Sequence, residues 1–198
     1  MPPARLRAAA DTPREIRIIG GQWRRTRLPV PDRPGLRPTP DRVRETLFNW
    51  LGQDLTGWRC VDAFAGTGAL GLEAASRGAA EVLLVEQDAA LAAQLRQTVQ
   101  HLQATGVQVQ RGDGVAALRR SALRSLHLVL IDPPFGQADL FAPALQAAAR
   151  AIAENGFIYL EAPQAWSDEA LAAYGLRVHR HLKAGAVHAH VLMSATPG

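Results

Sequence analysis

The distribution of hydrophobic and polar positions changes character near residue 59. From that point, short apolar runs rich in Val, Ile and Leu alternate with stretches whose apolar residues recur at helical spacing. The runs predict strands and the stretches predict helices, an alternation typical of an α/β fold in which helices cover both faces of a mostly parallel sheet. The predicted strands are Arg59–Phe64, Glu81–Glu86, Val107–Arg111, His127–Ile131 and Gly156–Glu161, and the predicted helices span residues 69–77, 88–103, 114–124 and 139–153.

The two ends of the chain show a different pattern, in which β-prone runs flank short turns. Near the C-terminal end, Leu176–Leu182 and Val187–Met193 predict an antiparallel hairpin. Near the N-terminal end, two shorter runs flank Gly20 and Gly21, and this glycine pair predicts a tight hairpin turn.

The segment from Pro29 to Pro40 contains five prolines, which favour an extended backbone and exclude a helix. Asp41 follows, and we expect its side chain to cap the next helix. The apolar face of that helix consists of Val43, Leu47, Phe48, Trp50 and Leu51. We therefore divide the chain into a disordered tail (residues 1–15), a hairpin with a basic connector (16–40) and a single α/β domain (41–198).

Arginines are concentrated in the first 44 residues of the chain. This region contains eleven arginines and four acidic residues, whereas the whole chain has a formal net charge of +4, so the remaining residues are mildly acidic. A basic arm attached to an acidic body indicates a polyanionic partner such as nucleic acid. A solvated arm without a specific partner would have the same composition, and both interpretations stay open at this point.

The overall composition is that of an ordinary globular protein, with 47% hydrophobic and 20% charged residues. No apolar run approaches the roughly 20 residues that cross a bilayer, and the N-terminal residues lack the apolar core of a secretory signal. Cys60 is the only cysteine and cannot form an internal disulfide. We expect a cytoplasmic, monomeric protein that does not associate with a membrane.

A glycine-rich loop follows the first predicted strand of the α/β region. Gly66, Gly68 and Gly71 fit the pattern G-x-G-x-x-G, which allows a tight strand-to-helix turn and a close approach of the backbone to a ligand. This pattern alone suits a dinucleotide equally well. Asp62 lies four residues before Gly66, and a carboxylate there disfavours pyrophosphate but suits the ammonium group of a methionine moiety.

Acidic residues also follow the next two predicted strands. Glu86 ends the second strand, where a carboxylate can accept hydrogen bonds from both hydroxyls of a ribose. Asp113 and Gly114 follow the third strand, where the carboxylate can accept the amine of an adenine while backbone N–H groups reach a ring nitrogen. Both acids predict an adenosine-type ligand, although a surface acid ending a strand is the alternative for Glu86.

The fourth predicted strand ends in Asp132-Pro133-Pro134-Phe135. Two prolines hold the segment extended and remove two N–H donors, so its carbonyls are fixed as acceptors. Asp132 and the Pro133 carbonyl can accept the two protons of an exocyclic amine while Phe135 stacks on the base. These hydrogen bonds favour a pyramidal nitrogen whose lone pair can attack a methyl donor, without a metal or covalent nucleophile.

The sequence resembles a known family, the RsmD-type 16S ribosomal RNA guanine-N2-methyltransferases, over about residues 16–193. The core motifs occur in many amino-methyltransferases, whereas the block that contains Arg37-Pro38-Thr39 and Asp41-Arg42-Val43-Arg44-Glu45 is more specific. The matching segments are 17–23, 36–39, 41–50, 62–74 and 132–135.

The resemblance implies a class I methyltransferase fold, which is Rossmann-like, with a seven-stranded mostly parallel sheet, an antiparallel C-terminal hairpin and a small N-terminal hairpin extension. It implies S-adenosyl-L-methionine as cofactor and 16S ribosomal RNA, or the small ribosomal subunit or its assembly intermediate, as partner. We therefore predict catalysis by Asp132, Pro133, Pro134 and Phe135; cofactor binding by Asp62, Phe64, Gly66, Thr67, Gly68, Glu86, Asp113, Gly114 and Arg42; and RNA binding by Trp23, Arg24, Arg25, Arg27 and Arg37.

Three other functions are consistent with some of these motifs. An adenine-N6 DNA methyltransferase would use the same Asp-Pro-Pro-aromatic loop but usually needs a further target-recognition domain. A nicotinamide-dependent oxidoreductase would explain the glycine loop but not Asp132–Phe135. A non-catalytic RNA-binding protein would not need the acids at positions 62, 86, 113 and 132.

The C-terminal hairpin contains four histidines, at positions 179, 181, 188 and 190. Their alternate spacing could indicate a metal site, but no cysteine or acid joins them at ligand spacing. We therefore expect exposed histidines on a strand face and no metal.

Overall fold

The computed structural model describes residues 14–195. A seven-stranded sheet of order β5-β4-β3-β6-β7-β9-β8 forms the centre of the fold, and all pairings are parallel except those of β9 with β7 and β8. This confirms the mostly parallel sheet with an antiparallel C-terminal hairpin. The strands of this sheet are β3 (Arg59–Asp62), β4 (Glu81–Glu86), β5 (Val107–Arg111), β6 (Leu126–Ile131), β7 (Ile152–Ala162), β8 (Leu176–Ala184) and β9 (Val187–Ser194).

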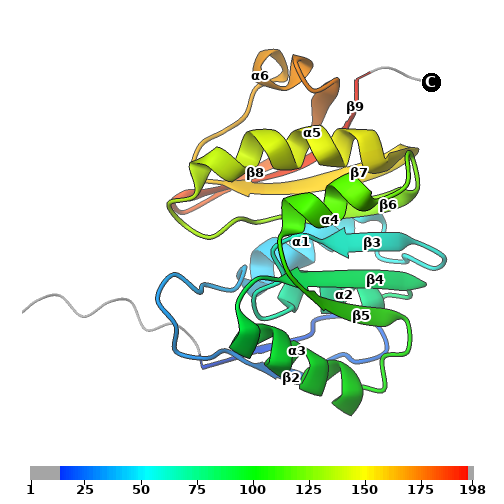
Figure 1. The fold of residues 1–198 in the computed structure, drawn as a ribbon, viewed down its shortest axis with the longest axis vertical. Helices are drawn as coiled ribbons and strands as arrows, with labels where there is room; N and C mark the ends of the chain where they lie inside the picture. Colours follow the sequence, from blue (N-terminus) through cyan, green and yellow to red (C-terminus); the bar gives the residue numbers. More distant parts are fainter. Residues whose placement is uncertain (1–13, 196–198) are drawn as a thin grey trace, which may run out of the picture.

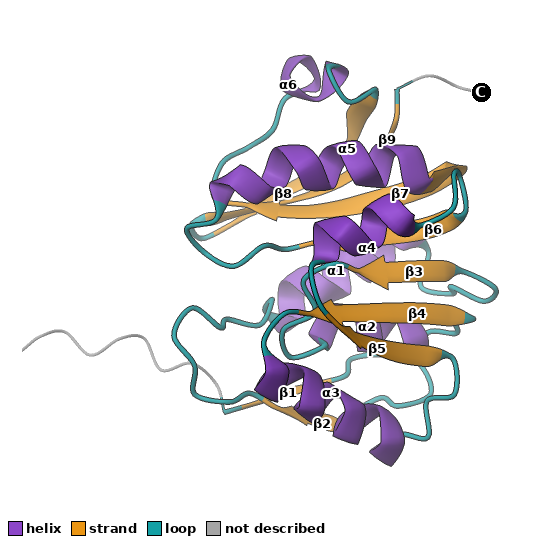
Figure 2. Ribbon diagram, in the orientation of Figure 1, coloured by secondary structure: helices purple, strands orange, loops and turns teal. Residues whose placement is uncertain are grey.

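Helices cover both faces of the sheet, with α1 and α2 behind it and α4 and α5 in front in Figure 1. Figure 2 shows the same layers coloured by element type. Alternate residues of the central strands pack into two hydrophobic cores: Leu130 and Tyr159 face α1 and α2, whereas Val129 and Ile158 face α4 and α5. The helices are α1 (Asp41–Leu51), α2 (Ala69–Ser76), α3 (Ala89–His101), α4 (Gly114–Arg120), α5 (Phe141–Ala151) and α6 (Asp168–Ala172), with a short 3₁₀ helix η1 at Ala138–Leu140.

Several elements begin or end at other residues than predicted. The first strand ends at Asp62 rather than Phe64. Strand β7 begins at Ile152 rather than Gly156, since α5 ends at Ala151 and the strand follows it directly. The short helix α6 was not predicted. Its N-terminal residue is preceded by Ser167, whose hydroxyl accepts a hydrogen bond from the Ala170 N–H.

The prediction that Asp41 caps α1 is wrong. Pro40 occupies the N-cap position, without a side-chain hydrogen bond, and Asp41 is the first helical residue. Its carboxylate instead pairs with Arg17 at 3.0 Å and with Arg44. Asp41 therefore joins α1 to the N-terminal hairpin.

The N-terminal hairpin exists, and Gly20 and Gly21 lie in its connecting loop, although this loop is longer than a two-residue turn. Strand β1 (Glu15–Arg17) pairs antiparallel with β2 (Arg27–Pro29), and the Gly21 carbonyl accepts a hydrogen bond from the Arg24 N–H at 3.3 Å within the loop. Gly21 has φ +75°, and a Cβ there would lie 1.8 Å from the Ser76 carbonyl oxygen. The glycines are therefore required for contact with α2. Residues 1–13 of the predicted tail lie outside the described residues, whereas its last residue, Glu15, begins β1.

A buried carboxylate attaches the N-terminal segment to α2. Glu73 has no exposed surface and accepts hydrogen bonds from the Ile19 and Gly20 N–H groups at 2.9 and 2.7 Å. Its oxygens also pair with Arg44 at 3.3 Å and Arg77 at 3.0 Å. Two cations and two backbone donors thus compensate one buried charge.

Arg44 is fully buried. Besides its two ion pairs, its guanidinium donates to the carbonyls of Thr39 and Arg17 at 3.1 and 2.9 Å. Burial lowers the pKa of Arg44, and its acidic partners oppose that shift. This arginine of the basic arm is therefore a structural residue.

Candidate active site

The carboxyl ends of the parallel strands bring the predicted site residues to one edge of the sheet. Asp62 of β3 pairs with Leu130 of β6, and Ile131 pairs with Leu160 of β7. Glu86 of β4 pairs with Arg111 at the end of β5. The glycine loop, the second and third acids and the Asp132 loop therefore follow neighbouring strands at the same edge, where open α/β sheets bind ligands.

The glycine loop has the tight geometry that the motif predicts. Gly66 and Gly68 have φ values of +54° and +82°, and Gly68 is the N-cap of α2. A Cβ on Gly71 would lie 2.2 Å from the Leu84 side chain and 3.1 Å from an oxygen of Asp62. The third glycine therefore lets α2 pack directly on the sheet beneath the loop.

Asp62 lies under this loop with 1% exposure. Its Oδ2 accepts a hydrogen bond from the Gly71 N–H at 3.1 Å, whereas its buried Oδ1 has no hydrogen-bond partner among the described residues. Burial, together with the nearby Glu86, raises the pKa of Asp62 to about 7. A buried carboxylate oxygen without a partner is costly unless it is protonated or a cation approaches.

Glu86 is partly exposed at the end of β4, and backbone donors fix its orientation. Its Oε2 accepts from the Gly66 N–H and its Oε1 from the Asp88 N–H, both at 2.8 Å. Asp113 is exposed and caps α4 by accepting from the Ala116 N–H at 2.9 Å. Both acids are thus held beside the glycine loop and retain acceptor capacity for a ligand.

The other predicted cofactor residues differ in exposure. Gly114 is buried, and a Cβ there would lie 1.9 Å from the Ala63 carbonyl oxygen, so packing against the segment that directly follows β3 requires this glycine. Thr67 is buried in the loop, Phe64 is partly buried against the core that faces α4 and α5, and Arg42 is exposed on α1.

Asp132 lies beside two other acids at the end of β6. Burial and the charges of Glu161 and Asp62 raise its pKa well above the usual range. No hydrogen bond from the described residues reaches its carboxylate. The following Phe135 is 90% exposed, so its ring is available for stacking.

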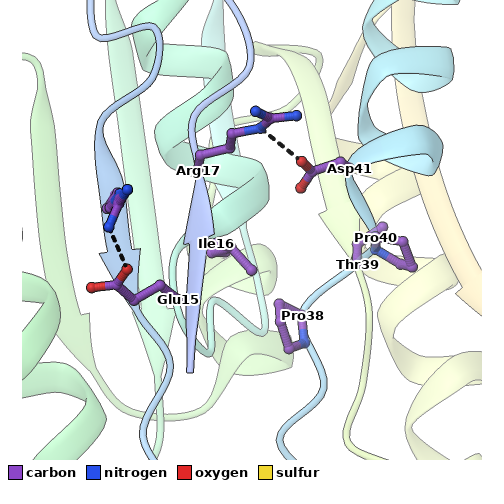
Figure 3. A pocket seen from close by; sticks show the side chains of 8 residues that line it. Glu15, Ile16, Arg17, Pro38, Thr39, Pro40 and Asp41 are labelled. Carbon is purple, nitrogen blue, oxygen red and sulfur yellow. Dashed lines mark hydrogen bonds and ion pairs between the residues drawn. The ribbon is translucent and has the colours of Figure 1, made fainter. Parts of the chain in front are cut away.

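Glu161 was not among the predicted site residues, yet it belongs to the same group of acids. Its Oε2 accepts from the Thr39 and Tyr159 hydroxyls at 2.9 and 2.8 Å, and burial raises its pKa. Thr39 lies in the specific Arg-Pro-Thr block, which was the only sequence signal near this contact. Thr39 also lines a hollow of about 510 Å³ between the N-terminal hairpin and the connector, shown in Figure 3.

The predicted RNA-binding residues do not lie together. Trp23 is partly buried against the core, and its backbone N–H donates to the Ser76 hydroxyl at the end of α2. It lines a hollow with the loops before β4 and β5, at the amino edge of the sheet, and the exposed Arg24 and Arg25 follow it. By contrast, the exposed Arg27 lines the hollow beside Thr39.

The prediction of exposed C-terminal histidines holds for His181 only: His179 and His188 are partly buried, and His190 is fully buried. Its Nε2 accepts from the Trp166 N–H at 3.0 Å, so its Nδ1–H donates to the Leu160 carbonyl at 3.2 Å. Burial lowers the pKa of His190 to about 4. Through these two hydrogen bonds, His190 of β9 holds the loop that contains Trp166 against the end of β7.

Residues 14–195 contain no group of three or more His, Cys, Asp or Glu side chains arranged to hold a metal ion. No helix in this part of the chain has the length and hydrophobicity needed to cross a membrane.

The sheet order, the two layers of helices and the acids at the carboxyl edge define a protein with the class I methyltransferase fold. The chain belongs to the family described as "Conserved hypothetical protein 95", which matches residues 16–193. This confirms the resemblance found in the sequence.

Named relatives agree with this membership. Ribosomal RNA small subunit methyltransferase D of Escherichia coli (strain K12) is 51% identical over 121 residues, which are 61% of this chain and 61% of the relative. The protein of the same name from Buchnera aphidicola (subsp. Acyrthosiphon pisum) is 34% identical over 74% of this chain and 78% of the relative. The matched region thus spans about three fifths of the E. coli relative's length.

Solved structures are also similar. The E. coli protein described as "Putative methyltransferase yhhF" superposes with a TM-score of 0.74 at 36% identity, covering 91% of this chain and 98% of that one.

Proposed function

We propose that this protein transfers the methyl group of S-adenosylmethionine to the N2 amine of a guanine in 16S ribosomal RNA of the small ribosomal subunit. The observation that carries the proposal is the Asp132–Phe135 loop, which follows β6 directly beside the strand that leads into the glycine loop. The names of the relatives support ribosomal RNA as substrate. The sequence resemblance supports guanine N2 as the position that is methylated.

The residues around the glycine loop, at the carboxyl edge of the sheet, fit a cationic adenosine cofactor. The unpartnered Oδ1 of Asp62 supplies negative charge, and Glu86 offers carboxylate oxygens for ribose hydroxyls. Asp113 and Gly114 would hold the adenine, and Phe64, Thr67 and Arg42 would complete the site. When bound, S-adenosylmethionine supplies an electrophilic methyl group on a sulfonium.

The Asp132 loop would orient the amine that accepts this methyl group. Asp132 and the Pro133 carbonyl accept its two N–H groups, which concentrates the nitrogen lone pair toward the methyl donor. Pro134 keeps the segment extended, and the exposed Phe135 ring stacks on the base. Because its pKa is raised, Asp132 is also suited to accept the proton that the amine loses after transfer.

The exposed arginines of the basic arm would bind the phosphates of the RNA, chiefly Arg27 and Arg37. Arg24 and Arg25 would contribute less, because they follow the partly buried Trp23 at the amino edge of the sheet. Arg27 lines the same hollow as Thr39, and Arg37 precedes Thr39 by two residues in the chain. We propose that a monomer acts on the RNA or on an assembling subunit in the cytoplasm.

Mass spectrometry of ribosomal RNA nucleosides from cells with and without the gene tests this function. We expect N2-methylguanosine to fall in the 16S RNA of cells without the gene and to return with the wild-type gene. A normal N2-methylguanosine level without the gene, or loss of a methylated adenine instead, would contradict the proposal.

Asp132→Ala tests the catalytic assignment in the purified protein. Turnover should fall at least ~100-fold, the usual scale for a lost positioning contact, while cofactor affinity changes far less. Asp139→Ala, which removes an exposed acid a few residues further along, is the control and should retain turnover. Near-normal methylation by the Asp132 variant would show that this carboxylate is not catalytic.

A further inference from the structure

One oxygen of Glu161 is already saturated, and the other is not. Oε2 accepts from the hydroxyls of Thr39 and Tyr159, and these two side chains are 3% and 0% exposed. No hydrogen bond from the described residues reaches Oε1. The carboxylate is therefore held in one orientation with a single oxygen left as an acceptor.

Glu161 on β7 and Asp132, directly after β6, occupy equivalent positions in adjacent segments of the sheet edge. Leu130 pairs with Tyr159 in the parallel ladder of β6 and β7, and Asp132 and Glu161 each follow two residues later. Since side chains alternate along a strand, Glu161 lies on the face that carries Leu130 and Tyr159. Asp132 continues this alternation one residue past the end of β6, close enough for the charge of Glu161 to raise its pKa. The amine-binding acid thus has a second acid directly at its side.

The three bases that carry an exocyclic amine differ at the ring nitrogen next to it. In guanine, N1 carries a hydrogen and is a donor. In adenine and cytosine, the corresponding ring nitrogen next to the amine carries a lone pair and is an acceptor. A second carboxylate beside the amine-binding acid can therefore form a hydrogen bond with guanine only and repels the other two bases.

We propose that Glu161 selects guanine by accepting its N1–H while Asp132 accepts its N2 amine, and that Thr39 and Tyr159 are positioning residues for Glu161. This inference rests on the proposed function. It assigns a role to Thr39, the residue of the Arg-Pro-Thr block that reaches the acidic edge.

Asp132 and the Pro133 carbonyl cannot make this choice alone. They accept two N–H groups of an amine, which adenine and cytosine also present. Burial raises the pKa of Glu161, and hydroxyl donation by Thr39 and Tyr159 opposes that shift. The two hydroxyls therefore favour the ionised carboxylate, which is the form that accepts N1–H. A site that must hydrogen-bond a substrate N–H discriminates strongly against an analogue that lacks it.

The experiment uses the full chain, S-adenosylmethionine and 16S ribosomal RNA assembled by ligation with one altered nucleotide at the guanosine mapped as the methylation site. 2-Aminopurine keeps the 2-amine but has a lone pair in place of N1–H, and inosine keeps N1–H but lacks the amine. Methylated nucleosides are quantified by mass spectrometry, and kcat/KM is measured for each RNA.

Wild-type protein should prefer guanosine to 2-aminopurine by at least ~100-fold and should leave inosine unmodified. Glu161→Gln should lower kcat/KM for guanosine by roughly 10- to 100-fold and reduce the preference below ~10-fold. The control Glu154→Gln changes an exposed acid on the same strand and should keep the wild-type preference. A wild type that methylates 2-aminopurine as well as guanosine, or a Glu161→Gln protein that keeps the full preference, would overturn the assignment.

Thr39→Val provides a second measurement that leaves the carboxylate in place. It should weaken the preference for guanosine by several-fold without changing cofactor affinity, and Thr39→Ser should restore the preference. An unchanged preference in Thr39→Val would overturn the positioning role. If wild-type protein methylates none of the RNAs, the proposed function itself fails, and this inference fails with it.

Discussion

Glu73 and Asp62 are both carboxylates with at most 1% exposure, but their surroundings differ. Glu73 receives two backbone hydrogen bonds and pairs with Arg44 and Arg77. Asp62 has one oxygen without a partner among the described residues, and the charge of Glu86 contributes to raising its pKa. Asp62 and Glu161 in turn raise the pKa of Asp132. A buried charge with complete compensation serves the fold, whereas a group of acids without compensation indicates where a cationic ligand and a donor-rich substrate would bind.

The largest effect should follow from removing a cation from the compensated centre, by which we mean Glu73 with its partners Arg44 and Arg77. Arg44→Met leaves Glu73 buried with one cation fewer, and we expect a loss of about 3–5 kcal/mol in the free energy of unfolding. Urea unfolding measures it, and Arg96→Met, at an exposed arginine of α3, should stay within about 0.5 kcal/mol of wild type. A loss below about 1 kcal/mol for Arg44→Met would remove the distinction between the two centres.

Neutralising Asp62, the acid of the uncompensated centre, should change the free energy of unfolding in the opposite direction. Burial raises the pKa of Asp62 from 3.8 to about 7, so the folded protein binds this proton more tightly than the unfolded chain. The Asp62 contribution to stability is therefore lost as the pH rises from about 4 to about 7.

Asp62→Asn removes this pH-dependent contribution. At pH 8 without cofactor, we expect the variant to be about 1–3 kcal/mol more stable than wild type, with the gain shrinking toward pH 5. Cofactor affinity should fall in the same variant. Asp139→Asn, at an exposed acid, is the control for both measurements. Destabilisation by Asp62→Asn at pH 8 would show that the Asp62 charge is compensated after all.

Glu86→Ala tests whether this second acid at the carboxyl edge of the sheet binds the cofactor. Removing its acceptors should raise the dissociation constant for S-adenosylmethionine roughly 10- to 100-fold while RNA binding is unchanged. Glu81→Ala changes an exposed acid at the opposite end of the same strand and should have no effect on cofactor affinity. If calorimetry gives the same cofactor affinity for wild type and Glu86→Ala, Glu86 does not bind the cofactor.

The smallest effect concerns the exposed arginines. Arg27→Gln with Arg37→Gln should weaken RNA binding and reduce the slope of log affinity against log salt by up to about two units, because each phosphate contact contributes about one. Arg24→Gln with Arg25→Gln, at the amino edge, should change the slope by less than about one unit. Identical slopes in both double variants would show that the RNA does not distinguish the two edges.

The parallel sheet and the glycine loop could be predicted because their signals are local. Alternating apolar runs mark the strands, and the spacing of Gly66, Gly68 and Gly71 marks a tight turn. The end of β6 is likewise evident from Asp132 and its two prolines. Their arrival at one edge follows from the parallel order of the strands.

The compensated centre and the second acid could not be predicted, because their partners are far apart in the sequence. Nothing near Arg44 distinguishes a buried arginine from the exposed ones around it, and its partner Glu73 lies 29 residues away. The glycine pair at positions 20 and 21 indicated the hairpin, but its close contact with α2 could not be seen in the sequence. The burial of His190 could not be predicted from its spacing, because the Trp166 N–H from which it accepts a hydrogen bond lies 24 residues away in the sequence.

The two attachments of the N-terminal segment also set an order of assembly. Ile19 reaches Glu73 across 54 residues, whereas Thr39 reaches Glu161 across 122. During synthesis, the first contact can form once α2 has been made, but the second requires β7, and longer loops cost more entropy to close. A growing chain can therefore form its glycine loop before Glu161 has been made. If Glu161 selects guanine as we propose, the ability to distinguish one base from another would be acquired late in folding.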